Sequence, residues 1–232
     1  MKKKDLAIHI PSSAIIRILA AIIFFLVLAS AGALCVRALT GHSSAYGFVP
    51  KFDVDRENNI PTYFSSFLLL VSAGLLAIVT MSKRRERAAY TRHWFVLMII
   101  FLFFSIDETA GLHELLIKPI RHALNVSAVG FPAWIVAGLA FVVIFGIFYY
   151  RFLLSLPAKT KRYLVIAAFF LVGGAIGVEV LGGTYYYGEW NPTYGAMTLI
   201  EEAFEMIGVL FFVVAMLDYI KLDKMDVVFS FK

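Results

Sequence analysis

The sequence has 232 residues, of which 61% are hydrophobic and 16% are charged, and its mean hydropathy is +0.83. A soluble globular protein, which carries about 25% charged residues, is excluded. The apolar residues fall in runs of about 20 rather than in alternating strands, which excludes an outer-membrane β-barrel. The single cysteine, Cys35, excludes an intramolecular disulfide. The net charge of +5 comes without a basic stripe interleaved with aromatic residues, so we expect no nucleic-acid partner.

Six apolar runs are long enough to cross a bilayer as helices, which requires about 20 residues each. They cover residues 13–36, 62–82, 94–116, 132–151, 163–183 and 196–220. We therefore predict an all-α, polytopic membrane bundle of six transmembrane helices, forming a single domain over residues 1–232. Pro61 and Thr62 are expected to open the second helix and Pro132 the fourth.

The basic residues predict the orientation of the bundle. Most of them fall on one side of the predicted helices: in the N-terminal segment 2–4, in the loops 83–92 and 151–162, and in the tail at Lys221, Lys224 and Lys232. The positive-inside rule assigns this side to the cytoplasm. Both termini are therefore predicted to be cytoplasmic, and the protein is expected to be a multi-pass protein of a bacterial inner membrane.

The loop before the second helix is rich in oxygen side chains. An EF-hand is excluded, because Asn58 and Phe64 stand where that motif requires glycine and glutamate. Two interpretations stay open. The loop either caps a site, with Arg56 as a counter-charge and Asp55 or Glu57 as a further ligand or acid, or it merely turns the chain into the helix.

Carboxylates gather in the outer halves of the third, fifth and sixth predicted helices, which contain no lysine or arginine. They are Asp107, Glu108, Glu114, Glu179, Glu201, Glu202 and Glu205. An ionised carboxylate at the bilayer centre costs about 2.5–3.5 kcal/mol on insertion scales, so something positive is expected beside them.

Helical spacing predicts that these groups converge. Asp107 and Glu114 are seven residues apart and would project from one stripe, as Glu201 and Glu205 would on the sixth helix. Glycines before and after Glu179 would let a neighbouring helix approach; they are Gly173, Gly174, Gly177, Gly182 and Gly183. We predict one site formed by the three helices.

Oxygen ligands with one imidazole suit Mg²⁺, Mn²⁺, Ca²⁺ or iron, and suit Zn²⁺ less well. The predicted cofactor is therefore a divalent metal ion. Its predicted ligands are Asp107, His113, Glu114, Glu179, Glu201 and Glu205. Catalytic roles are expected for Glu108 and Glu205, and supporting roles for Asp55, Arg56, Glu57, Ser66 and Glu202. Ser65 is expected to be a small helix-contact residue.

Alternatively, the carboxyl groups are protonated and stabilise the bundle through hydrogen bonds to Ser105, Thr109, Ser66 or tyrosines.

The predicted function is metal-dependent chemistry on a lipid-linked substrate, by hydrolysis or by a redox reaction, at a site facing the periplasmic side. The competing function is proton- or cation-coupled transport, which the apolar inner halves of the three helices disfavour. A third alternative is a non-catalytic subunit of an oligomer or a larger membrane assembly. The expected partners are membrane lipids.

Several motifs resemble those of a group of bacterial multi-pass membrane proteins to which no activity is attached. They are residues 55–62 with Ser65 and Ser66, Ser105-Ile106-Asp107-Glu108 with His113-Glu114, and Glu201-Glu202 with Glu205-Met206. Ser66, Asp107 and His113 also resemble, by residue type, the zinc site of the membrane hydrolases that include alkaline ceramidases and progestin-and-adipoQ receptors. Those proteins have seven helices and paired histidines on the last one, where this chain has Glu201 and Glu205.

Overall fold

The computed structural model describes residues 11–56, 58–124, 133–186, 189–223 and 225. Six helical segments are long and apolar enough to cross a membrane, as predicted. They are α1 (Ser12–Thr40), α3 (Ile60–Arg85), α4 (Thr91–Ala110), α6 (Ile135–Ser155), α7 (Ala158–Val172) with its continuation to Gly183, and α9 (Pro192–Leu222). The described residues contain no strand.

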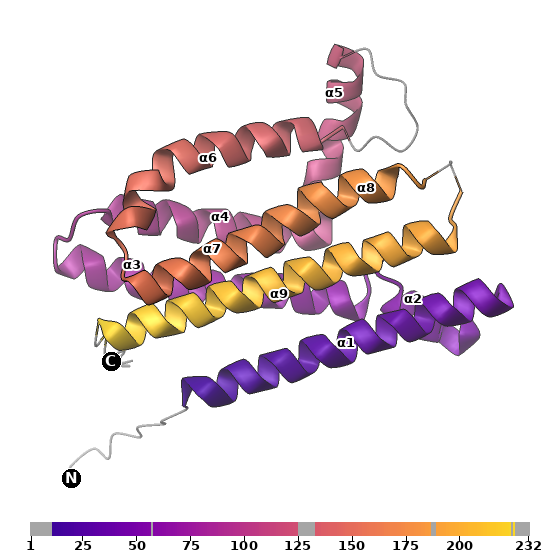
Figure 1. Cartoon of the computed structure of the whole chain (residues 1–232), viewed down its shortest axis with the longest axis horizontal. Coiled ribbons are helices and arrows are strands. Elements are labelled where there is room, and N and C mark those ends of the chain that lie inside the picture. Colours follow the sequence, from indigo (N-terminus) through magenta and orange to yellow (C-terminus); the bar gives the residue numbers. More distant parts are fainter. Residues whose placement is uncertain (1–10, 57, 125–132, 187–188, 224, 226–232) are drawn as a thin grey trace, which may run out of the picture.

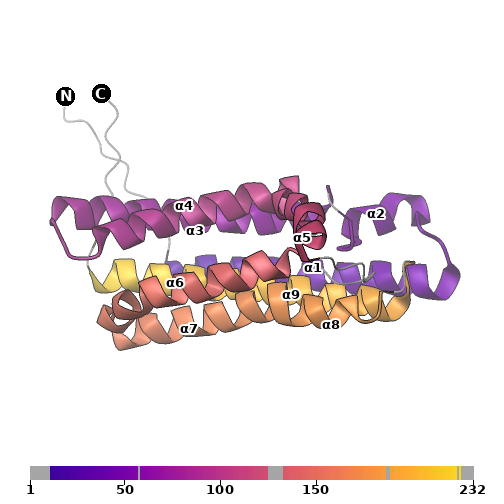
Figure 2. The same cartoon turned by 90° about the horizontal axis from the view of Figure 1, so that it is seen from above.

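Shorter elements connect the long helices at one end of the bundle (Figure 1). They are 3₁₀ turns at Ala45–Gly47 and Leu112–Leu116, α2 (Phe48–Phe52) and α5 (Ile117–Leu124). We call this end, where α9 begins, the outer end, following the orientation predicted from the basic residues. At the opposite inner end α1 begins, α9 ends, and the α3–α4 and α6–α7 connections lie (Figures 1 and 2).

Two asparagines start the central helices. Asn59 accepts a hydrogen bond from the Thr62 amide at 2.8 Å, and Asn191 accepts one from the Tyr194 amide at 2.9 Å. A proline follows each asparagine within the first turn, where its missing N–H costs nothing. Both helices therefore begin a few residues before the predicted starts. The predicted role of Pro132 lies outside the described residues.

The third predicted helix is shorter than expected. It ends at Ala110, because Gly111 takes the left-handed conformation (φ 56°) and its amide donates to the Asp107 carbonyl. The chain continues as the 3₁₀ turn that carries His113 and Glu114. The prediction that Asp107 and Glu114 share one helical stripe is therefore wrong.

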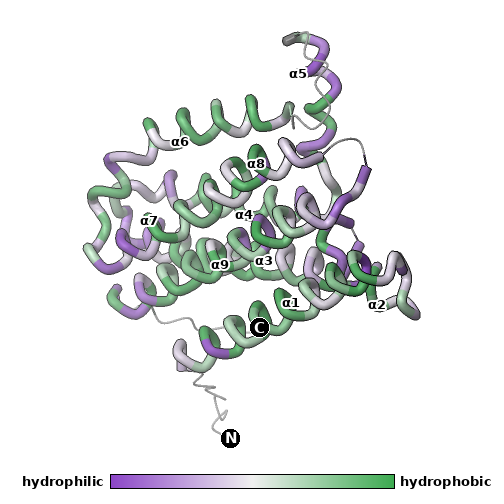
Figure 3. The backbone as a smooth tube through the Cα atoms, turned by 45° about the vertical axis from the view of Figure 1, so that its right-hand side comes forward, coloured by the Kyte–Doolittle hydropathy of each residue, from purple (hydrophilic) through white to green (hydrophobic). Residues whose placement is uncertain are grey.

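The apolar core lies around α3 and α9, which are more buried than the other long helices. Hydrophobic positions run along the long helices, while hydrophilic ones collect near their ends and in α5 (Figure 3). Gly208 of α9 lets α7 come close: a Cβ there would lie 2.7 Å from the Leu171 side chain and 3.1 Å from the Ala167 carbonyl oxygen. Helix α6 is the least buried of the six.

Helix α7 widens into a π-helix over Gly173–Val178 before it continues as α8 (Glu179–Gly183). Such wide turns rotate the side chains that follow relative to a regular α-helix and are frequent at functional sites. Here the residue directly after the π-helix is Glu179.

Candidate functional site

A cavity of about 1380 Å³ extends along the bundle between α3, α4, α6, α7 and α9. Its outer part is strongly acidic. Eight carboxylates line the cavity, against two arginines, Arg56 and Arg121, and His113; the carboxylates are Asp55, Asp107, Glu108, Glu114, Glu179, Glu201, Glu202 and Glu205. All seven predicted carboxylates of the three helices thus line one cavity. Its inner part is lined by apolar and aromatic side chains, among them Leu97, Phe101, Phe152 and Leu164.

Three carboxylates of α9 are central to this site. Glu201, Glu202 and Glu205 are half-buried, and within the described part of the chain no hydrogen bond or ion pair reaches them. Glu205 lies close enough to Glu201, Glu202, Glu108 and Glu179 that ionising these groups together would bring like charges near one another. Counted from the start of α9, Glu201 is about 14 Å and Glu205 about 20 Å along the helix. The cavity therefore carries three carboxyl groups well inside the bundle that have no basic partner among the described residues.

Asp107 and His113 form a closely bonded pair across the break in α4. One oxygen of Asp107 accepts a hydrogen bond from the His113 amide at 2.8 Å, and the other lies 3.0 Å from Nδ1 of the imidazole. With Nδ1 donating to Asp107, Nε2 is left to accept a proton. Burial lowers the pKa of His113, but the hydrogen bond and charge of Asp107 outweigh it, so the pKa lies above the ordinary value.

A tryptophan that sequence reasoning missed links this pair to Glu179. The indole N–H of Trp134 donates to Glu179 at 3.0 Å, and its ring meets the His113 ring edge-on at a centroid distance of 5.0 Å. Tyr186 and Tyr194 also line the cavity, with their rings 5.0 Å apart. An aromatic residue at the outer start of a transmembrane helix usually indicates an interfacial anchor, so the sequence carried no signal for this contact.

The glycines around Glu179 differ in how closely the neighbouring helix approaches them. A Cβ on Gly174 would lie 3.0 Å from the Glu201 carbonyl oxygen and 3.2 Å from Cγ of Glu205, so this glycine brings the two acidic helices together. Gly182 similarly fits against Met197, whereas a Cβ added to Gly177 would meet no atom within 4 Å. The predicted close approach is confirmed at Gly174 and Gly182.

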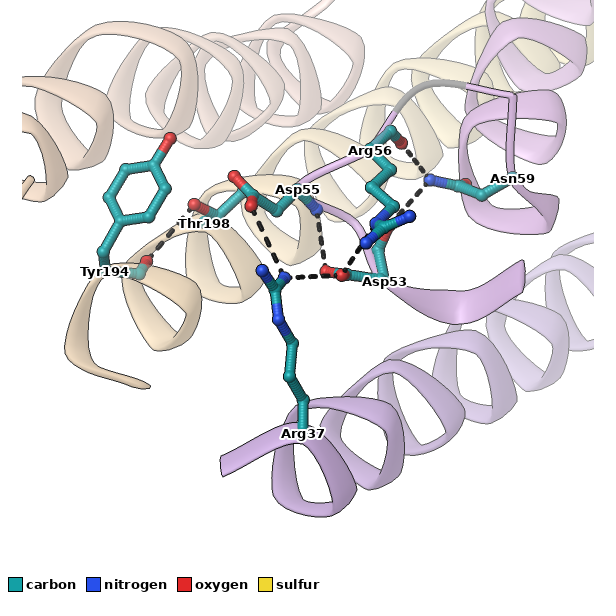
Figure 4. A network of polar contacts seen from close by, with 7 residues as sticks. All are labelled: Arg37, Asp53, Asp55, Arg56, Asn59, Tyr194 and Thr198. Carbon is teal, nitrogen blue, oxygen red and sulfur yellow. Dashed lines mark hydrogen bonds and ion pairs between the residues drawn. The ribbon is translucent and has the colours of Figure 1, made fainter. Parts of the chain in front are cut away.

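The loop before α3 lines part of the cavity and carries an ion-pair network (Figure 4). Arg37 of α1 contacts Asp53 at 2.7 Å and Asp55 at 3.7 Å, and Arg56 contacts Asp53 at 3.4 Å. The guanidinium of Arg37 also lies 3.8 Å from the centre of the Trp190 ring. Arg56, the predicted counter-charge, is therefore paired with Asp53, and the sequence did not indicate Arg37.

Asp55 belongs both to this network and to the cavity wall. Burial, together with the negative charge of Asp53, raises the pKa of Asp55 above its ordinary value despite the opposing charge of Arg37. Of the two interpretations of this loop, the capping one is favoured for Asp55 and Arg56, since both line the cavity. Glu57 lies outside the described residues.

Two neighbouring serines exchange their predicted roles. Ser66 donates to the Ser105 carbonyl at 2.6 Å and Ser105 donates to the Ser66 carbonyl at 2.8 Å, so this pair joins α3 to α4. Ser65 lines the cavity instead, and its hydroxyl is buried without a hydrogen-bond partner among the described residues; the residue is 6% exposed. Thr109 bonds to the Ile106 carbonyl. Within the described ranges, neither Ser105 nor Thr109 is bonded to a carboxylate.

The expected metal centre is not supported by the described residues. Among them, no three histidine, cysteine, aspartate or glutamate side chains come together closely enough to hold a metal ion. Asp107 and His113 bond to each other, and Glu179 bonds to Trp134, so these predicted ligands already have partners. The predicted residues thus share one cavity without forming a ligand cluster.

The chain belongs to a protein family described as Domain of unknown function (DUF8692), whose model matches residues 18–219. This match covers most of the chain and includes every residue of the acidic cavity. No curated protein and no solved structure matches the chain significantly.

Proposed function

We propose that this member of the DUF8692 family binds a membrane amphiphile with a positively charged, ammonium-type head group. The observation that carries the proposal is the polarity of the cavity, which is acidic at its outer end and apolar at its inner end. An amphiphile lying along the bilayer normal has the same division between a polar head and an apolar tail. The protein would therefore receive its ligand from the bilayer in which it lies.

The acidic end favours an organic cation over a metal ion. Glu201, Glu202 and Glu205 supply carboxyl groups that can pair with a cation, without forming a compact ligand set. Trp134 and Tyr194 supply aromatic faces, which attract alkylammonium groups and are the usual elements of sites for quaternary ammonium ligands. The hydroxyl of Ser65, which has no partner among the described residues, adds a polar atom at the cavity wall. Together these groups suit a head group that is large, cationic and capable of hydrogen bonding.

The apolar end has room for an alkyl chain. At about 1380 Å³ the whole cavity exceeds the range of about 300–1,000 Å³ typical of small-molecule sites. The side chains of Leu97, Phe145, Leu164 and Leu171 line it away from the carboxylates. Burying each methylene group of a chain there gains about 0.8 kcal/mol relative to water.

Helix α6 provides a route from the bilayer. It forms one wall of the cavity but is the least buried long helix. Near the inner end Tyr149 of α6 holds it to α4 by donating to the His93 carbonyl at 2.9 Å, and near the outer end Trp134 contacts His113. Between these contacts, separation of α6 from α4 would admit a chain from the side.

The Asp107–His113 pair is the group best arranged for proton transfer at the head group. Asp107 fixes the imidazole through Nδ1, and Nε2 can then accept a proton from a substrate hydroxyl, an ammonium group or a water molecule. This role makes His113 a stronger candidate base than Glu108 or Glu205, for which catalytic roles were predicted. A hydrolytic or redox reaction on a lipid-linked substrate stays a prediction, as does assembly into a larger complex.

The test is quenching of Trp134 fluorescence by a long-chain alkylamine brominated near its head group, in phosphatidylcholine nanodiscs. Trp94→Phe and Trp190→Phe remove the other tryptophans. We expect the amine to quench the fluorescence saturably. The apparent affinity should be at least about tenfold weaker for the matching neutral alcohol. The affinity for the amine should fall by a similar factor in Glu202→Gln/Glu205→Gln. Equal quenching by amine and alcohol would refute the proposal.

The same preparation distinguishes the other two functions. Near-stoichiometric metal that is lost in Asp107→Asn/Glu205→Gln would support a metal centre formed by movement of these side chains. Cation or proton flux into proteoliposomes that is lost in Glu205→Gln would support transport. The inner wall of the cavity disfavours transport, because its described lining there is apolar and aromatic rather than charged.

A further inference from the structure

A second, smaller pocket lies at the inner end of the bundle, in the connection between α3 and α4. Its volume is about 480 Å³, and its lining contains three arginines, Arg84, Arg87 and Arg92. His93, Tyr90, Thr91 and Ala88 complete the described lining, which includes no carboxylate. The pocket is thus the electrostatic opposite of the acidic cavity.

The backbone of this connection has a defined shape. Arg87 and Tyr90 both take the left-handed conformation, with φ of 52° and 65°. The Thr91 hydroxyl bridges the turn, bonding to the Lys83 carbonyl at 3.2 Å and to the Ala88 carbonyl at 2.8 Å. His93 is held by stacking on Phe152 at a centroid distance of 5.4 Å. The arginines therefore project from a fixed turn.

The positive charge of the pocket is not compensated from within the described chain. Arg84, Arg87 and Arg92 are exposed, and none of them forms an ion pair with a described residue. The nearby acid, Glu86, is bonded to Lys83 at 2.9 Å and to Ser82 at 3.2 Å. Helix α4 begins at this pocket with neither a side-chain cap nor an acidic residue in its first turn, which adds to the positive potential.

We propose that this pocket binds the phosphate group of an anionic membrane lipid. Arginine pairs with phosphate through two parallel hydrogen bonds, and basic pockets at the ends of transmembrane helices recognise anionic head groups. Phe95 and Val96, one turn into α4, are exposed apolar residues on which an acyl chain could lie. Their position favours a lipid phosphate over a free phosphate ion as the ligand.

The experiment titrates phosphatidylglycerol into phosphatidylcholine nanodiscs that contain the full chain, and counts retained phosphatidylglycerol by native mass spectrometry. Arg87→Gln is compared with Arg85→Gln. Arg85 is an exposed arginine two residues away that does not line the pocket, so both variants remove one charge from the same surface. We expect the apparent affinity to fall about tenfold in Arg87→Gln and by less than about twofold in Arg85→Gln.

Equal losses in the two variants would overturn the proposal, because they would indicate general attraction between a basic loop and an anionic surface. Absence of any preference for phosphatidylglycerol over phosphatidylcholine in the wild type would overturn it too. Millimolar inorganic phosphate serves as a competitor. Failure to displace the lipid is the expected result, whereas full displacement would overturn the choice of a lipid and assign the pocket to a free phosphate ion. Matching melting temperatures of the two variants exclude misfolding as the cause.

Discussion

The described carboxylates at the inner end of the bundle have basic partners that three carboxylates of the acidic cavity lack within the described chain. At the inner end Asp218 is bonded to Lys159 at 2.6 Å, and both Glu86 and Asp223 are bonded to Lys83, at 2.9 and 2.6 Å. In the acidic cavity Glu201, Glu202 and Glu205 have no such partner among the described residues. The chain therefore pairs these inner carboxylates with lysines, and leaves Glu201, Glu202 and Glu205 without a described basic partner around a space that can receive a ligand.

The largest expected effect is the loss of alkylammonium binding when two of the unpaired carboxyl groups, Glu202 and Glu205, are replaced. Each hydrogen bond to a charged group contributes about 1.5–3 kcal/mol, so Glu202→Gln/Glu205→Gln should weaken alkylammonium binding by at least about tenfold. The same change should leave the protein as stable as the wild type or more stable, because it removes mutual repulsion. Binding titrations and thermal unfolding in one detergent measure both. A large loss of stability would show that these acids hold the bundle together.

The inner end should respond in the opposite way. Lys83→Met removes the partner of both Glu86 and Asp223, and Lys83 is itself buried. We expect the free energy of unfolding to fall by about 1–3 kcal/mol, with alkylammonium binding unchanged. Denaturation of the purified protein, with Lys221→Met as a surface control, checks this expectation. A loss of ligand binding without a loss of stability would contradict the division between the two ends.

A matched pair of glycine substitutions sharpens the geometry of the acidic end. Gly174→Ala places a methyl group 3.0 Å from the Glu201 carbonyl oxygen and should separate α7 from α9, costing about 1–3 kcal/mol of stability and weakening ligand binding severalfold. Gly177→Ala meets no atom within 4 Å and should change neither quantity measurably. Equal behaviour of the two variants in unfolding and binding assays would show that close contact between these helices is unimportant.

The smallest expected effect is a pH dependence from Asp55. Its pKa is higher in the folded protein than the ordinary 3.8, so the folded state holds this proton more tightly. The resulting stabilisation is present below that ordinary value and is lost as pH rises through the raised pKa. Asp55→Asn should flatten this part of the stability profile measured by thermal unfolding. An unchanged profile in the variant would exclude Asp55 as its source.

Much of the fold could be predicted because the bilayer imposes length and apolar composition on each helix. The six spans and the common cavity of the seven carboxylates follow from these constraints and from the rise of a helix. The break at Gly111 could not be foreseen, since a single glycine inside an apolar run is compatible with a continuous helix. It moved His113 off the helix of Asp107 and into hydrogen-bond contact with that residue.

Contacts between distant segments also could not be predicted from the sequence. Ser65 and Ser66 are chemically identical neighbours, and only the packing of α3 on α4 decides that Ser66 bonds to Ser105 while Ser65 lines the cavity. Arg37 is likewise an ordinary basic residue at a helix end until the fold brings it to Asp53 and Asp55. The metal hypothesis relied on residue types and helical spacing, and the fold distributes those residues along a cavity instead.

The most direct test is to identify the amphiphiles that co-purify with the protein from its native membrane in mild detergent. Lipids extracted from the wild type and from Glu202→Gln/Glu205→Gln would be compared by high-resolution mass spectrometry. The account predicts an amphiphile with a cationic nitrogen that is strongly enriched over the bulk membrane in the wild type and absent from the variant. Identical lipid profiles in the two preparations, without such a molecule, would contradict it.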